Sequence, residues 1–154
     1  MKTILVPVDF SPVSRKVVDE ALELAEVTGA RIVLMHSVPP APIIATDLAP
    51  LAGSALQLTD DLEKAAERQL QRLQRDVKNH GVPIETVCTS GFPVTNILAE
   101  AKRVGANYIV IGSHGHTAFY DLVIGSIASG VLKRAPCPVI VVPPVKKAKA
   151  RGRR

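Results

Sequence analysis

The chain has 154 residues, of which 47% are hydrophobic and only 3% aromatic, and a formal net charge of +5 at pH 7. This length fits one domain with its own core, and the aliphatic composition favours buried parallel strands over a single-strand nucleic-acid binder, which needs aromatic stacking platforms. Six positive charges lie in the last nine residues, so we expect one domain over residues 1–145 and a disordered basic tail over residues 146–154.

The first third of the chain predicts a strand, a helix and a second strand. The β-rich run over residues 2–8 predicts a buried strand. A helix-start signal follows, with Ser11 as the N-cap and Pro12 as the first helical residue. Apolar residues at helical spacing extend this helix to Gly29, a typical C-cap. The apolar run over residues 30–38 predicts the second strand.

The next segment predicts a long connection and a long helix. The Pro- and Ala-rich residues 39–55 form a connection that is long for a compact domain, and it fits either a lid over a ligand or a flexible tether. A helix is expected from about Leu56 to Asn79. Its expected inward face consists of Leu62, Ala66, Leu70, Leu73 and Val77.

The rest of the chain continues the alternation. Strands are expected within residues 83–89, 106–113 and 137–143, and helices within residues 90–105 and 124–136. The last helix has an expected apolar stripe of Ile127, Ala128, Val131, Leu132 and Ala135.

This order predicts a three-layer α/β fold with an open, doubly wound parallel sheet of five strands. Such sheets bind ligands at the carboxyl ends of the strands, where the strand order reverses. With the expected order 3-2-1-4-5, that crevice lies between the strand that leads to Asp9 and the strand that ends at Gly112.

Glycines cluster between the fourth strand and the last helix, at Gly112, Gly115 and Gly125, and Ser126 follows. Glycine lets the backbone approach a ligand closely, and a helix N-terminus offers N–H donors and partial positive charge. The pattern therefore predicts an anion site suited to a nucleotide polyphosphate, with Asp9 accepting from ribose hydroxyls. A strand end and an N-cap without any ligand have the same pattern, so the residues alone leave both interpretations open.

Over about residues 1–143 the chain resembles the universal stress protein family. The family's nucleotide signature, G-x2-G-x9-G-[ST], is matched in spacing and in context by the glycine cluster and its serine. The run VPVDFS resembles the family's first strand, GFPVTNIL its Gly-x-Pro turn, and APCPVIVVP its closing strand.

The resemblance implies a Rossmann-like fold of the adenine nucleotide alpha hydrolase type. It also implies ATP binding, with or without Mg²⁺ or Mn²⁺, and a role in stress survival. Family members without the glycine signature do not hold ATP, so this chain is expected among the ATP binders. The implied contact residues are Pro7, Val8, Asp9, Val38, Gly112, Ser113, His114, Gly115, His116, Gly125, Ser126 and Ile127, with Val38 at the adenine.

Two positions depart from the family's pattern. His116 stands where the family often has arginine after the second glycine, so a permanent charge at the phosphates is replaced by a group that titrates near physiological pH. This replacement implies weaker or pH-dependent affinity. Asn107 stands where an aspartate often begins the fourth strand, and we expect it to be structural.

Enzymatic activity is expected to be slow or absent, with ATP as a conformational ligand and no catalytic residue. The Walker lysine motif does not occur, and a loop histidine such as His114 is more often a polar contact than a base. His36 and His80 are also expected to be structural. The alternatives are a slow ATPase in the same pocket and a ligand-free interaction module whose basic tail contacts nucleic acid.

The remaining expectations concern assembly and location. The closing strand, residues 138–142, would form an apolar sheet edge, which is prone to aggregate unless it is paired, so we expect a homodimer through this strand. Cys88 and Cys137 lack metal or redox spacing and indicate reduced thiols. No apolar run reaches the length of a membrane span or a signal-peptide core, so we expect a cytoplasmic protein without a membrane partner.

Overall fold

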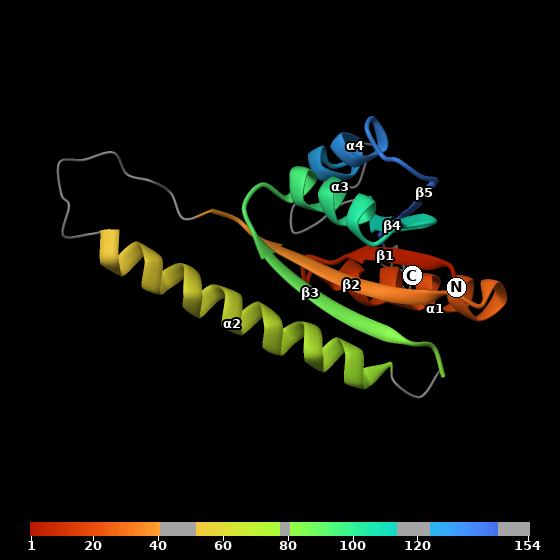
Figure 1. Ribbon diagram of the computed structural model, residues 1–154, viewed down its shortest axis with the longest axis horizontal. Coiled ribbons are helices and arrows are strands. Elements are labelled where there is room, and N and C mark those ends of the chain that lie inside the picture. Colours follow the sequence, from red (N-terminus) through yellow and green to blue (C-terminus); the bar gives the residue numbers. More distant parts are fainter. Residues whose placement is uncertain (41–51, 78–80, 114–123, 145–154) are drawn as a thin grey trace, which may run out of the picture.

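The computed structural model describes residues 1–40, 52–77, 81–113 and 124–144 (Figure 1). The basic tail and residues 41–51 lie outside the described residues. The elements follow one another as β1 (Thr3–Pro7), α1 (Pro12–Thr28), β2 (Arg31–Val38), α2 (Ala52–Asp76), β3 (Ile84–Ser90), α3 (Pro93–Arg103), β4 (Tyr108–Gly112), α4 (Ser126–Leu132) and β5 (Val139–Val142).

The five strands form one parallel sheet in the order β3-β2-β1-β4-β5. This order confirms the predicted fold class and the predicted strand order. The chain winds outward from β1 in both directions, so the strand order reverses between β1 and β4. Asn107 helps to fix this junction, because its Oδ1 accepts from the Thr3 backbone N–H at 2.9 Å and its own N–H donates to the Thr3 carbonyl at 2.8 Å. Its expected structural role is thereby confirmed.

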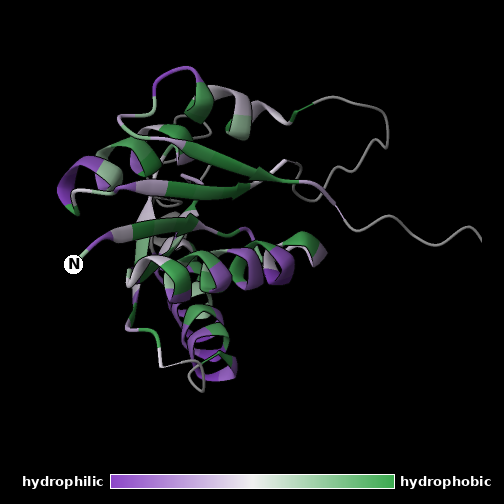
Figure 2. Ribbon diagram, turned by 90° about the vertical axis from the view of Figure 1, so that its right-hand side faces the viewer, coloured by the Kyte–Doolittle hydropathy of each residue, from purple (hydrophilic) through white to green (hydrophobic). Residues whose placement is uncertain are grey.

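Two helical layers cover the sheet, with α1 and α2 on one face and α3 and α4 on the other (Figure 1). Successive strand residues point to opposite faces, so Ile4 and Val6 pack in the α1/α2 layer and Leu5 in the α3/α4 layer. Figure 2 shows the hydrophobic strands between helices whose outer surfaces are largely hydrophilic. Burying each such aliphatic side chain is worth about 1.5–3 kcal/mol.

The ends of α1 agree with the sequence prediction. Ser11 is the extended N-cap, Pro12 is the first helical residue, and Gly29 ends the helix with φ 63° and ψ 33°. This left-handed conformation lets the Ala30 N–H donate back to the Ala25 carbonyl at 3.0 Å, which is the reason for a glycine there.

The helix α2 differs from the prediction. It begins at Ala52, inside the expected connection, and ends at Asp76. Leu62 is 47% exposed, whereas it was expected to face the core. Ser90, the last residue of β3, donates its hydroxyl to Glu63, so the residues before Glu63 extend past the carboxyl end of the sheet, as Figure 1 shows. Leu62 therefore lies beyond the described strands, which leaves its side chain exposed.

The helix α4 is also shorter than predicted. It covers only Ser126–Leu132. Within the expected apolar stripe, Ala128 and Val131 are buried, whereas Ile127 and Leu132 are 42% and 41% exposed. A two-turn helix packs only a narrow strip against its neighbours, so the wider predicted stripe is wrong.

Among the described residues, no helix combines the length and the apolar character that crossing a membrane requires.

Candidate functional site

A cavity of about 700 Å³ opens at the carboxyl end of the sheet, at the reversal of strand order between β1 and β4. Its lining comes from the ends of β1, β2 and β4, the start of α1, and the starts of α3 and α4. This volume lies within the range of about 300–1,000 Å³ that is typical of small-molecule sites. The cavity therefore occupies the place that the sequence predicts for a ligand.

The first wall of the cavity consists of the end of β1 and the start of α1, and it presents a carboxylate. Asp9 Oδ1 accepts a hydrogen bond from the Ser11 backbone N–H at 3.0 Å and another from Ser14 Oγ at 3.0 Å. Both donors belong to the start of α1, where a negative charge is stabilised by the helix dipole. The carboxylate is therefore held in a fixed position at the cavity.

The turn between β1 and α1 has an unusual backbone. Phe10 has φ 60°, a region that non-glycine residues rarely adopt. Its ring lies against the ring of His36 on β2, with centroids 4.4 Å apart, and His36 Nδ1 lies 2.7 Å from the Val8 carbonyl oxygen. His36 thus has the structural contacts that the sequence leads us to expect, but it also lines the cavity.

The second wall of the cavity consists of the end of β4 and the start of α4, and it presents mainly backbone. The Ser113 N–H donates to the Val142 carbonyl at 2.8 Å, and the Gly125 N–H donates to the Ser113 carbonyl at 2.7 Å. These bonds place the start of α4 directly beside the end of β4. The first N–H groups of a helix have no acceptor within the helix, so donors at the start of α4 can serve a ligand.

Gly125, the N-cap of α4, lines the second wall. Its φ of −56° and ψ of 157° are accessible to any residue, so the backbone conformation does not require glycine. A side chain here would project from a residue that lines the cavity. Glycine adds no side chain at this point of the second wall.

The end of β2 forms a third side. Met35 and Ser37 line the cavity, whereas Val38, the expected apolar contact, is buried and is not among the lining residues. Ser37 Oγ accepts from Asn96 Nδ2 at 2.8 Å, and Asn96 Nδ2 also lies 3.0 Å from the Ser90 carbonyl oxygen. Asn96 thus ties the ends of β2 and β3 to the start of α3.

Most of the predicted contact residues meet at this one cavity. From the first wall these are Pro7, Val8 and Asp9, and from the second Gly112, Ser113, Gly125, Ser126 and Ile127. The other predicted contacts, His114, Gly115 and His116, lie outside the described residues. The prediction did not include Met35, His36, Ser37, Pro39, Gln69 and Pro93, which also line the cavity. Strand alternation through β2 could have indicated Met35 and Ser37, whereas no sequence signal pointed to Gln69 on α2.

The thiols of Cys88 and Cys137 lie outside the cavity, and the surroundings of each raise its pKa. Burial raises the pKa of the Cys88 thiol, and the nearby carboxylates of Glu67 and Glu63 raise it further. Burial also raises the pKa of Cys137. A raised pKa reduces the reactive thiolate fraction, which agrees with the expected reduced thiols. Over the described parts of the chain, no group of three or more His, Cys, Asp or Glu residues is arranged to hold a metal ion.

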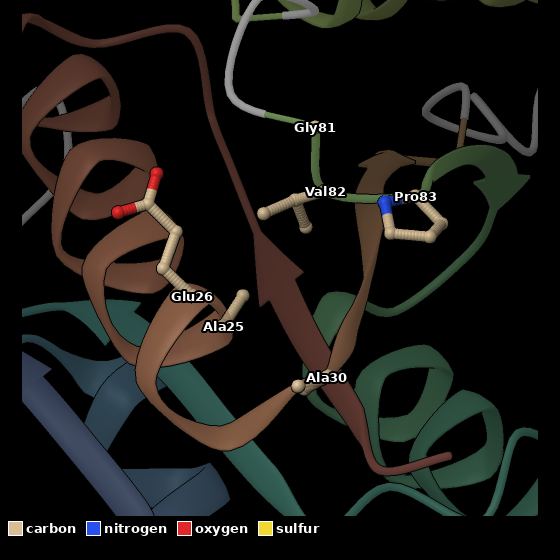
Figure 3. A pocket seen from close by; sticks show the side chains of 7 residues that line it. Ala25, Glu26, Ala30, Gly81, Val82 and Pro83 are labelled. Atoms are coloured by element: carbon tan, nitrogen blue, oxygen red, sulfur yellow. The ribbon is translucent and has the colours of Figure 1, made fainter.

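A second pocket, of about 340 Å³, lies at the opposite end of the sheet (Figure 3). It lies between the end of α1, with Glu26 on one side, and the segment before β3, with Val82 and Pro83 on the other. Among the described residues, Glu26 is its only charged lining residue, and the others are Ala, Gly, Val and Pro. The pocket lies far from the reversal of strand order, so the larger cavity is the better candidate for a ligand site.

The fold is that of an α/β protein of the Rossmann-like type, with a cavity at the reversal of strand order. The family model described as the universal stress protein family matches residues 1–143, and the chain belongs to this family.

Known proteins similar to the chain agree with this assignment. Universal stress protein MJ0531 of Methanocaldococcus jannaschii is 30% identical over 146 residues, which cover 95% of this chain and 84% of that protein. The structure of universal stress protein UspA from Lactobacillus plantarum has a TM-score of 0.80 at 27% identity and covers 92% of this chain and 97% of its own. A universal stress protein in complex with cAMP has a TM-score of 0.59 at 25% identity, with 92% and 95% covered.

Proposed function

We propose that the chain binds ATP in the cavity between β1 and β4 and acts as a nucleotide-responsive regulatory protein in cytoplasmic stress survival, with little or no hydrolysis. The observation that carries this proposal is the pairing of two walls across one cavity, a fixed carboxylate on one side and open backbone on the other. The spacing G-x2-G-x9-G-S supports a polyphosphate at the open wall. The similar protein that binds cAMP supports an adenine nucleotide.

The two walls suggest how ATP would lie. Its triphosphate would face Gly112, Gly125 and Ser126, where N–H donors and a hydroxyl are available. Its ribose would face Asp9, because a carboxylate accepts hydrogen bonds from hydroxyl groups. Its adenine would face the apolar side chains of Pro7 and Val8. Mg²⁺ or Mn²⁺ could accompany the triphosphate, since such ions take most of their ligands from phosphates and water.

The described groups around the cavity support weak or absent hydrolysis. In the described part of the chain, the ionisable lining side chains are Asp9 and His36. Asp9 accepts two hydrogen bonds from the start of α1, and His36 is bonded to a backbone carbonyl. Neither is arranged as a base for an attacking water. ATP would instead stabilise the folded, bound protein by mass action.

Three measurements on the purified protein test this function. Mass spectrometry of nucleotide carried through purification should find ATP or its products. Added ATP should raise the Tm, because a ligand at one hundred times its Kd stabilises the fold by about 2.7 kcal/mol. Phosphate release should stay at the level of buffer. No rise in Tm with or without Mg²⁺ would contradict ATP binding, and release well above buffer would favour the ATPase alternative.

We also propose a homodimer that forms through β5, near residues 138–142. β5 is an edge strand of the sheet, and Ile140 in it is 39% exposed. Pairing two copies of β5 across a two-fold axis would satisfy the free edge and cover this side chain.

Light scattering tests this assembly. The wild-type chain should have the mass of a dimer at micromolar concentration, and Ile140→Lys should have that of a monomer. The matched control is Val27→Lys, because Val27 on α1 is 87% exposed and should leave the dimer intact. A wild-type monomer would contradict the proposal.

A further inference from the structure

The turn between β1 and α1 adopts a conformation that its own sequence does not favour. Among the described residues, Phe10 is the only non-glycine residue with positive φ, at 60°. A bulky side chain makes left-handed backbone unfavourable, and such strain persists only where the surroundings impose it. The residues on either side, Asp9 and Ser11, line the cavity together with Phe10. The strained turn is therefore part of the site.

His36 contacts this turn at two points. Its ring packs against the Phe10 ring, with centroids 4.4 Å apart and planes 32° apart. Its Nδ1 lies 2.7 Å from the Val8 carbonyl oxygen. A carbonyl oxygen can only accept, so Nδ1 must carry the hydrogen and donate it. His36 thus holds the residue before Asp9 by a hydrogen bond and the residue after it by ring packing.

Both the N–H and the carbonyl of Val8 are hydrogen-bonded to residues of β2. Its N–H donates to the Met35 carbonyl at 2.8 Å, and its carbonyl accepts from His36. The β1–β2 pairing ends one residue earlier, at Pro7. At Val8 the His36 side chain therefore provides the hydrogen bond that a paired strand would provide. Without this donor the half-buried carbonyl would lose its partner, and the turn could relax to negative φ.

Asp9 lies between these two contacts. Its carboxylate is oriented from the other side by the Ser11 N–H and Ser14 Oγ. The position of the carboxylate therefore depends on a backbone held by His36 and on donors at the start of α1. Relaxation of the turn would move Asp9 relative to the second wall.

We propose that His36, with the hydrogen on Nδ1, is a positioning residue for the nucleotide: by holding Val8 and Phe10 it fixes the left-handed turn that presents Asp9 to the ribose. This inference rests on the proposed ATP binding and names the residue on which the geometry of the first wall depends.

A matched pair of variants separates the hydrogen bond from the bulk of the ring. His36→Leu keeps an apolar side chain but removes the donor to Val8. His36→Asn keeps an N–H attached to Cγ, at the place of Nδ1. We expect His36→Leu to weaken ATP binding about tenfold, because the turn is no longer held in the conformation that presents Asp9, and His36→Asn to recover most of the affinity. Equal losses in both variants would overturn the role of the hydrogen bond.

A double-mutant cycle tests whether His36 acts through Asp9. In the Asp9→Asn background, His36→Leu should cause no further loss of ATP affinity. Full additivity of the two losses would overturn the inference. ¹⁵N NMR of the wild-type chain should find the His36 hydrogen on Nδ1, and a hydrogen only on Nε2 would also overturn it.

Phe10→Gly provides a second variant, because glycine accepts positive φ without strain. It should lower the Tm, because the Phe10 ring also packs against the core, and it should weaken ATP binding, since the turn loses its packing against His36. If His36→Leu does not fold, this variant decides: unchanged affinity overturns the inference. If the wild-type chain binds no ATP, the proposed function fails as well. If it binds ATP but the cycle is additive, only the inference fails.

Discussion

The two walls of the cavity hold their chemical groups in different ways. The first wall, at β1 and α1, presents the Asp9 carboxylate, which accepts from Ser14 on α1, next to a Val8 carbonyl that accepts from the His36 side chain on β2. The second wall, at β4 and α4, presents backbone that is joined by the bonds from Ser113 to Val142 and from Gly125 to Ser113. Geometry on the first wall is therefore sensitive to the loss of side-chain contacts, whereas the second wall is sensitive to added bulk.

The largest effect is expected from bulk on the second wall. Gly125→Val should weaken ATP binding about a hundredfold, at the upper end of the cost of forcing extra carbon atoms into a filled space. The observed φ and ψ of Gly125 are accessible to valine, so the Tm without nucleotide should change little. Isothermal titration calorimetry measures the loss, and adenosine, which lacks phosphates, should be affected much less.

The control for this variant is Thr95→Val, on an exposed position of α3 that does not line the cavity. It should bind ATP like the wild type. If Gly125→Val binds ATP normally, the second wall does not receive the phosphates, and the contrast between the walls is lost.

A smaller effect is expected from the carboxylate of the first wall. Asp9→Asn keeps the size of the side chain and an oxygen that can accept from Ser11 and Ser14, but it removes the charge. It should weaken ATP binding about tenfold, because a hydrogen bond to a charged group is worth about 1.5–3 kcal/mol.

Comparison with 2′,3′-dideoxy-ATP sharpens this prediction. The wild-type chain should bind the dideoxy nucleotide more weakly than ATP, whereas Asp9→Asn should distinguish the two much less. If both proteins show the same preference for ATP, Asp9 does not contact the ribose hydroxyls.

The smallest effect is expected from a single support of Asp9. Ser14→Ala removes the hydroxyl that donates to Oδ1 at 3.0 Å, while the Ser11 N–H still donates. Loss of one such bond should weaken ATP binding about threefold, within the usual net value of a hydrogen bond. Ser129→Ala, on α4 and away from the cavity lining, should have no measurable effect. Equal binding by Ser14→Ala and Ser129→Ala would show that Asp9 needs no support from α1.

The same contrast explains what the sequence could predict. The second wall is local in the chain, so the spacing of Gly112, Gly125 and Ser126 indicated it directly. Asp9 could be predicted because it directly follows a strand whose place in the sheet follows from the alternation of elements. The proposed role of His36 could not be predicted. It depends on the contact of β2 with the residues after β1 and on the left-handed backbone of Phe10, and no residue pattern indicates either.

One error has a simple geometric cause. Leu62 fits the apolar periodicity of α2 but is exposed, because periodicity shows which residues share a helix face and does not show where the sheet beneath that face ends.

The central claim is that ATP occupies the cavity between β1 and β4, and backbone amide NMR during an ATP titration tests it most directly. We expect the largest shifts at Val8–Ser11 on the first wall and at Gly112, Ser113 and residues 125–127 on the second, and none at Gly29 or Gly81 in the pocket at the opposite end of the sheet. Absence of shifts at both walls, or shifts confined to that opposite pocket, would contradict the claim.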